Sequence, residues 1–217
     1  MWYSELLWIV GFYEVGNNKE LEIKFHISDL PGLERRLQAL GATCSQVRLH
    51  EVNLRFDTPD GSLASGSRVL RLRQDNAARL TYKGPTTYEQ GVRVRTEIEF
   101  VVDDFDAARL FLEALAYQVV MTYEKYRTTY EMGGTHITLD EMPYGNFMEI
   151  EGPDSDHILA VNAQLGLDWE RRVPDSYTVI FDHLRQTMGW SFQDLSFKDF
   201  EGLEFSLEGI GIHPADR

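Results

Sequence analysis

Charged and apolar side chains alternate with a period of two along much of this chain, and this pattern constrains the fold more than any other feature. In the segment ELEIKFHI, Glu20, Glu22 and Lys24 share one face, because successive side chains of a β-strand point to opposite sides. Leucine, isoleucine and phenylalanine occupy the other face. Such strands need cover on their apolar side and gather charge on the other. The chain is therefore predicted to be rich in antiparallel sheet.

The same alternation predicts eight strands, near residues 19–28, 46–57, 67–74, 78–84, 91–102, 118–130, 134–141 and 146–152. Apolar residues at helical spacing predict four helices, near 31–40, 105–116, 155–166 and 175–189. Amphipathic helices must bury their apolar stripes, and the apolar strand faces are the natural partners. We expect an α+β domain with the helices packed outside and the charged strand faces turned away from them.

The number of strands permits a closed barrel. Eight antiparallel strands can close around a lumen wide enough for side chains or one small ligand. Closure would join the charged rows of separate strands in the interior of a tunnel. An open sheet with one charged face has the same periodicity, so both architectures are compatible with the pattern.

Length and charge restrict the organisation and the partners. The 217 residues, 43% of them hydrophobic, fit one globular domain. We predict an N-terminal extension over 1–18, a core domain over 19–189 and an acidic C-terminal tail over 190–217. The formal net charge of −14 should repel nucleic acid and anionic membranes, so an anionic ligand needs a local basic cluster. The single cysteine, Cys44, forms no internal disulfide, which suits a cytoplasmic protein.

Like charges stand side by side on several predicted strands, roughly 7 Å apart. The pairs are Glu20 and Glu22, Arg71 and Arg73, and Glu149 and Glu151. An exposed strand face explains any single row, but the recurrence favours ligands of opposite charge between the pairs. Paired carboxylates suit hard divalent cations. Paired arginines suit phosphate oxygens, which the planar guanidinium group meets with two hydrogen bonds.

The charged segments follow one another in a distinctive order: ELEIK, VLRLR, TYKGP, RTEIE, EKYR, LDEMPYGNFMEIE and DSYTVIF. This series, over about residues 19–182, resembles the CYTH superfamily, the triphosphate tunnel metalloenzymes. It is most similar to the class IV adenylyl cyclase branch, with triphosphatases as relatives. The resemblance implies a closed eight-stranded tunnel that binds a triphosphate-bearing small molecule together with Mg²⁺ or Mn²⁺.

The resemblance also implies roles for individual residues. The catalytic candidates, which would also grip phosphate, are Lys24 and Lys83. The remaining phosphate-binding residues would be Arg71, Arg73, Arg95, Lys125 and Arg127. Metal would be held by Glu20, Glu22, Glu149 and Glu151. Supporting residues, which orient the basic groups or reach metal through water, would be Glu97, Glu99 and Asp140.

The resemblance favours conversion of ATP into cyclic AMP and pyrophosphate. The alternative is a triphosphatase that releases orthophosphate from inorganic triphosphate, thiamine triphosphate or a nucleoside triphosphate. Some triphosphatase relatives carry a lysine near the position of Ser176 and Tyr177, and this chain has none there. A non-catalytic sensor of polyphosphate or nucleotide is a further alternative. We expect no nucleic-acid or membrane partner, and a homodimer is possible.

Two other features admit two interpretations each. His26 follows Lys24 on the charged face of the first strand and could contact a ligand or have a structural role. Ser176 and Tyr177 begin a helical pattern, where helix capping and a functional role are equally compatible with the sequence.

Overall fold

The structure, a computed structural model, describes residues 19–217. Its strands are β1 (Lys19–Ile27), β2 (Thr43–Asp57), β3 (Val69–Gln74), β4 (Ala78–Glu89), β5 (Val92–Val102), β6 (Gln118–Met132), β7 (Thr135–Met142) and β8 (Gly145–Glu151). Its helices are α1 (Leu30–Ala39), α2 (Ser62–Ser65), α3 (Phe105–Ala114), α4 (Ser155–Leu165) and α5 (Tyr177–Met188), with short 3₁₀ turns at Trp169–Arg171, Lys198–Phe200 and Leu207–Ile210. The predicted extension over 1–18 lies outside the described residues.

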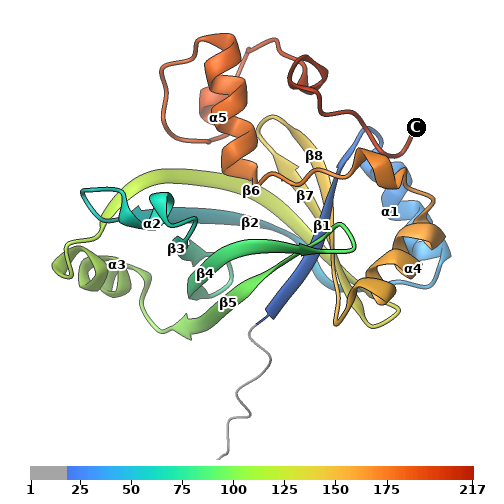
Figure 1. The fold of residues 1–217 in the computed structure, drawn as a ribbon, viewed down its shortest axis with the longest axis horizontal. Helices are drawn as coiled ribbons and strands as arrows, with labels where there is room; N and C mark the ends of the chain where they lie inside the picture. Colours follow the sequence, from blue (N-terminus) through green and yellow to red (C-terminus); the bar gives the residue numbers. More distant parts are fainter. Residues whose placement is uncertain (1–18) are drawn as a thin grey trace, which may run out of the picture.

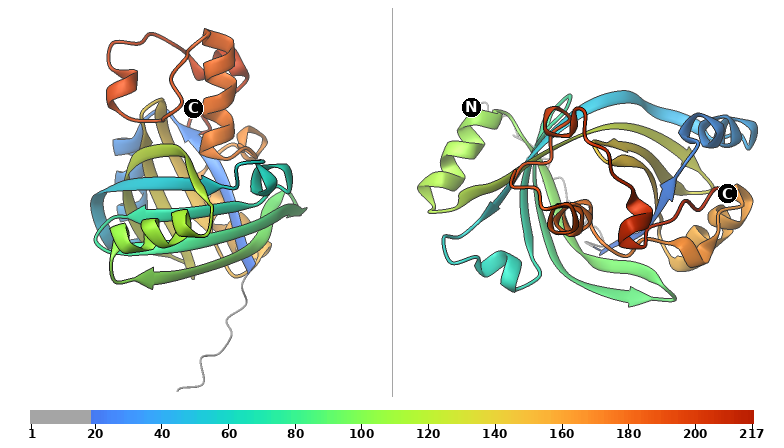
Figure 2. Two further views of the ribbon diagram at one scale, coloured as in Figure 1. Left: turned by 90° about the vertical axis from the view of Figure 1, so that its left-hand side faces the viewer. Right: turned by 90° about the horizontal axis from the view of Figure 1, so that it is seen from above.

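The eight strands form one antiparallel ring in the order β1-β5-β4-β3-β2-β6-β7-β8, which closes because β8 pairs with β1 (Figure 1). Glu22 of β1 stands opposite Arg93 on one side and Glu151 on the other. The ring is visible from above in Figure 2, with α5 lying over its opening. The prediction of an α+β fold with eight antiparallel strands is confirmed, and closure excludes the open sheet.

Two helices cover the outer face of β1 and its neighbours. The apolar side chains of β1 are buried together with residues of α1 and α4: Leu21, Ile23, Phe25, Ile27, Leu33, Leu37, Ile158 and Leu165. Asp29 caps α1 by accepting a hydrogen bond from Gly32 N. Because the apolar side of β1 faces these helices, its charged side faces the interior of the ring.

The helices α3 and α5 have different positions. Leu112 of α3 packs over Leu54, Phe56 and Leu72 of β2 and β3. The helix α5 lies at one end of the ring rather than on its wall (Figures 1 and 2).

Residues 190–217, predicted as a tail, continue from α5 and pack with it: Leu195, Phe200 and Leu207 share a buried cluster with Phe181 and Phe147. Among the described residues, no helix has the length and apolar character needed to span a membrane.

Candidate functional site

A cavity of about 430 Å³ occupies the interior of the ring, and all eight strands and the start of α5 contribute to its wall. Its lining includes ten lysines and arginines and eight aspartates and glutamates. The whole chain has a net charge of −14. The interior is therefore richer in basic groups than the rest of this acidic protein, which is the arrangement that an anionic ligand requires.

All the predicted site residues except one line this cavity. Those lining it are Glu20, Glu22, Lys24, Arg71, Arg73, Lys83, Arg95, Glu97, Glu99, Lys125, Arg127, Glu149 and Glu151. The exception, Asp140, has no exposed surface and lies beneath the lining side chains, where Lys125 Nζ donates a hydrogen bond to it over 3.1 Å. The sequence pattern thus brings together the side chains that it predicted to meet.

A first cluster joins β1, β4 and β5. Glu20 accepts hydrogen bonds of 2.7 Å from both Lys83 Nζ and Arg95 Nε. Burial alone would raise the pKa of Glu20, but Lys83, a hydrogen bond with Glu97 and Arg95 hold it well below its usual range. Burial raises the pKa of Glu97 to about 7. The positive charge of Lys83 opposes this shift, and Glu20 adds to it. One carboxylate of this pair is therefore ionised and the other retains its proton up to neutral pH.

A second cluster joins β1, β6, β7 and β8. Lys24 Nζ lies 3.3 Å from Glu149 Oε1, and Arg127 Nη2 donates to Glu149 Oε2 over 2.7 Å. Arg127 Nε also donates to Asp140 Oδ1 over 2.6 Å. Burial opposes the charge on Glu149, yet Lys24 and Arg127 hold its pKa well below the usual range. Asp140 thus holds the guanidinium group of Arg127 in place from beneath the cavity lining.

A third cluster surrounds the adjacent arginines of β3. Glu99 accepts from Arg71 Nη2 over 3.2 Å and from Arg73 Nη2 over 3.0 Å. Glu51 lies between Arg73 and Lys125, at 3.8 Å and 3.5 Å. Burial would raise the pKa of Glu51, but Lys125, Arg127 and the two β3 arginines lower it to about 2. The repulsion between neighbouring arginines is therefore offset by acidic groups from other strands.

Glu51, Arg93 and Arg55 also line the cavity, although none was predicted as a site residue. Each alternates with apolar residues in β2 or β5, and alternation alone does not distinguish a ligand-binding group from a supporting one. Arg93 Nη1 lies 3.1 Å from Glu22 Oε1. Arg55 Nη1 donates to Thr178 Oγ1 over 2.6 Å and so joins the wall to α5.

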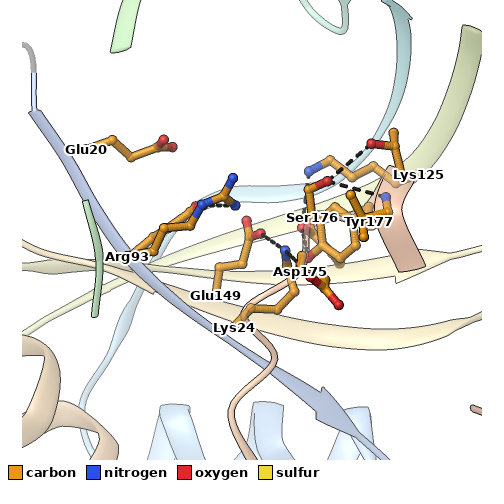
Figure 3. Close-up of polar contacts among 12 residues, drawn as sticks. Glu20, Lys24, Arg93, Lys125, Glu149, Asp175, Ser176 and Tyr177 are labelled. Carbon is orange, nitrogen blue, oxygen red and sulfur yellow. Dashed lines mark hydrogen bonds and ion pairs between the residues drawn. The ribbon is translucent and has the colours of Figure 1, made fainter. Parts of the chain in front are cut away.

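The start of α5 closes one side of the cavity (Figure 3). Ser176 Oγ caps the helix by accepting from Val179 N. Tyr177 points into the interior, where its ring lies 4.1 Å below Lys24 Nζ and its hydroxyl group donates to Asp140 Oδ2 over 2.8 Å. Lys24 Nζ also donates to the carbonyl oxygen of Asp175 over 3.0 Å. Ser176 thus has the capping role that the sequence allowed, and Tyr177 lines the cavity.

His26 of β1 and Asp57 of β2 lie outside the cavity lining. The ring of His26 packs on Phe147 with a centroid separation of 5.4 Å, and residue 26 forms a bridge with Pro214 of the C-terminal segment. His26 therefore lies outside the lining of the interior cavity, because the C-terminal segment occupies that end of the strand. Asp57 accepts hydrogen bonds from Leu63 N and Ala64 N, at the start of α2.

The acidic side chains suit a hard divalent cation, whose ligands are oxygens. Glu22 and Glu151 are cross-strand partners. Burial, followed by the nearby charges of Glu20 and Glu22, raises the pKa of Glu151. Carboxylates that stand opposite one another in this way repel each other, and a cation between them relieves the repulsion. Within 19–217, no three acidic, histidine or cysteine side chains are grouped ready for a metal; Glu20, Glu22 and Glu149 are paired with basic groups instead.

Comparison with known proteins agrees with this geometry. The CYTH domain model matches residues 18–175, and the chain belongs to the CYTH domain family. One relative is the adenylate cyclase CyaB of Aeromonas hydrophila, 31% identical over 136 residues, which cover 60% of this chain and 67% of the relative. The resemblance inferred from the sequence is confirmed.

Solved structures share the fold. A proposed adenylate cyclase from Vibrio parahaemolyticus superposes with a TM-score of 0.66 at 22% identity, over 75% of this chain and 97% of that one. The PH1012 protein of Pyrococcus horikoshii gives a TM-score of 0.62 at 25% identity, over 73% and 96% of the two chains. The ring of strands is therefore an architecture found in other proteins.

Proposed function

We propose that this chain is a divalent-metal-dependent enzyme that acts on the triphosphate of a nucleotide, and that its favoured reaction converts ATP into cyclic AMP and pyrophosphate. The observation that carries the proposal is the enclosed lining of ten basic side chains interleaved with acidic ones, in a protein with a net charge of −14. The relationship with a protein named as an adenylate cyclase supports the cyclase reaction.

Charge neutralisation accounts for most of the chemistry at a triphosphate, which carries about three to four negative charges. Each basic cluster is already held in place by carboxylates, as Glu20 holds Lys83 and Arg95. A phosphate chain would take over these contacts without large rearrangement of the basic groups. Groups fixed in advance in a partly buried cavity stabilise developing charge better than mobile water does.

Lys24 is our candidate for the proton transfer of the cyclase reaction. Burial lowers the pKa of Lys24, although Glu149 and Glu22 oppose the shift, and a lysine with a lowered pKa exchanges its proton more readily near neutral pH. The ribose 3′-hydroxyl oxygen would bond to the α-phosphorus while the bond to the bridging oxygen breaks. The neutral form of Lys24 would accept the hydroxyl proton, and Lys83 and Arg95 would balance the charge on the departing pyrophosphate.

Mg²⁺ or Mn²⁺, when bound, would neutralise phosphate oxygens and align the triphosphate. The residues that would hold the metal are Glu20, Glu22, Glu149 and Glu151, whose oxygen donors suit either ion. The raised pKa of Glu151 supports their assignment to a cation.

A triphosphatase is the second candidate, and the lining itself favours it. Charged side chains from most of the strands line the main cavity, so an inorganic triphosphate would find the same contacts as the triphosphate of a nucleotide. In that reaction water attacks the terminal phosphorus and orthophosphate leaves. A polyphosphate or nucleotide sensor would need the same contacts without the chemical step.

Incubation with ATP and Mn²⁺, and separately with inorganic triphosphate and Mn²⁺, tests the proposal. Cyclic AMP and pyrophosphate are the expected products from ATP. Orthophosphate without cyclic AMP would replace the cyclase by a triphosphatase. Tight binding without turnover with either metal would support a sensor, whereas loss of activity in folded Lys24→Ala and Glu22→Gln would count against one.

A further inference from the structure

A second cavity of about 370 Å³ lies beside β1 and shares Glu22, Lys24 and Arg93 with the interior cavity. Its other residues are Ile23 of β1, Tyr88 and Gly91 of the β4–β5 hairpin, and four residues between 170 and 174. This volume is within the range of small-molecule sites. Because both cavities include the same three charged side chains, we call the second one the side branch.

The side branch exists because β1 changes its partner halfway along the strand. The pairing of β1 with β5 runs only from Lys19 to Glu22. Beyond that point the segment before α5 lies beside β1, and Val173 N donates to the carbonyl oxygen of Lys24 over 2.8 Å. The wall at this level is therefore made by a strand on one side and a loop on the other, and the side branch lies between them.

Tyr88 gives the side branch an aromatic wall. Tyr88 pairs with Arg93 across β4 and β5, so the two side chains share the face that lines the interior. A register shift between Lys83 and Thr86 turns Tyr88 to this face, whereas Tyr82 of the same strand lies on the opposite face. The side chain of Tyr88 is 54% exposed. Its ring is thus available to a planar ligand.

The rest of the side branch is less charged than the main cavity. Val173 and Pro174 contribute apolar surface, and Glu170 and Arg172 contribute one acidic and one basic group, 3.5 Å apart. A planar heterocycle needs this combination of a stacking surface and polar groups for its edge. A phosphate chain needs the dense charge of the main cavity instead.

We infer that the side branch binds the organic part of the substrate, a planar nitrogen heterocycle such as a nucleobase, while the triphosphate lies in the main cavity. This inference rests on the proposed function and extends it to the nucleoside. Lys24 and Arg93, which belong to both cavities, are then placed at the junction where the α-phosphate meets the sugar. An inorganic triphosphate would leave the side branch unused.

Calorimetric titrations with ATP and with inorganic triphosphate, each with Mn²⁺, test this inference in wild type, Tyr88→Ala and Tyr88→Phe. We expect Tyr88→Ala to weaken ATP binding by about 5- to 100-fold and to change inorganic triphosphate binding less than about twofold, because base stacking is lost and phosphate contacts are not. Tyr88→Phe keeps the ring and should bind both ligands like wild type. The matched control is Tyr82→Ala, on the same strand and the opposite face.

The outcomes separate the inference from the proposed function. Unchanged ATP affinity in Tyr88→Ala, or an equal loss for both ligands, would overturn the inference and leave the proposed function standing. A wild-type protein that binds inorganic triphosphate but not ATP would also overturn it and would favour the triphosphatase. A wild-type protein that binds neither ligand would overturn both.

Discussion

Tyr177, the first residue of α5, donates a 2.8 Å hydrogen bond to Asp140 of β7. Asp140 has no exposed surface and also accepts from Lys125 and Arg127. Because this carboxylate joins two basic side chains of the cavity to the helix at the end of the ring, the closure of that end and the arrangement of the charged interior depend on one another.

Removal of the Tyr177 hydroxyl group should therefore destabilise the fold. Tyr177→Phe leaves the ring beneath Lys24 but removes a hydrogen bond to a buried carboxylate, at a cost of about 1.5 to 3 kcal/mol. Urea unfolding of wild type and variant measures the loss. Tyr82→Phe is the control, since the Tyr82 hydroxyl group has no hydrogen-bond partner among residues 19–217. Equal stability of the two variants would contradict the account.

Neutralising Glu22 should affect anion binding and metal-dependent turnover in opposite directions. Glu22 pairs with Arg93 in the cavity, so Glu22→Gln releases a basic group and removes a negative charge. Binding of inorganic triphosphate in EDTA should tighten by roughly 1 to 2 kcal/mol. Turnover with Mn²⁺ should fall, because a proposed metal ligand is lost. Glu131→Gln, with a side chain that is 56% exposed, should change neither, and weaker metal-free binding by Glu22→Gln would argue against these contacts.

The raised pKa of Glu97 predicts a defined dependence of stability on pH. Burial raises the pKa to about 7 from the ordinary 4.5. Between pH 4.5 and pH 7, Glu97 loses its proton in the unfolded chain and keeps it in the folded chain. The stabilisation that protonated Glu97 gives the fold is therefore complete below pH 4.5 and is lost as the pH rises through 7. Glu97→Gln retains a neutral side chain, and its melting temperature should therefore rise relative to wild type between pH 5 and pH 8.

Glu51 provides the opposite case for the same experiment. The pKa of Glu51 is lowered from 4.5 to about 2. The stabilisation that ionised Glu51 gives the fold is therefore complete above pH 4.5 and is lost as the pH falls through 2. Glu51→Gln should be less stable than wild type throughout pH 5 to 8, with a constant difference in that range. Parallel pH profiles for the two variants would contradict the assigned environments.

Much of the interior was predictable because strand geometry has a fixed period. The alternation in β1 places Glu20, Glu22 and Lys24 on one face, and the structure has all three in the cavity lining. The same is true of Arg71 and Arg73 in β3. Closure of the ring was not predictable from alternation, because pairing between β1 and β8 depends on residues distant in the sequence.

The failures of the pattern also have physical causes. His26 continues the row of Lys24, but the C-terminal segment pairs beside it at the end of the strand. Tyr88 reaches the inner face only because a register shift interrupts the alternation of β4. The position of Tyr177 depends on how α5 docks on the ring, which a helical repeat does not specify. Each case needs a contact between segments that the local sequence does not encode.

Calorimetric titration of inorganic triphosphate with Mg²⁺ measures whether the charged interior binds a triphosphate. We expect saturable binding of one triphosphate per chain, at least tenfold weaker in Lys83→Ala and unchanged in Lys198→Ala, which alters a lysine outside the cavity lining. At a hundredfold excess over Kd, the ligand should also stabilise the fold by about 2.7 kcal/mol. No saturable binding, or equal affinity in the two variants, would contradict the account.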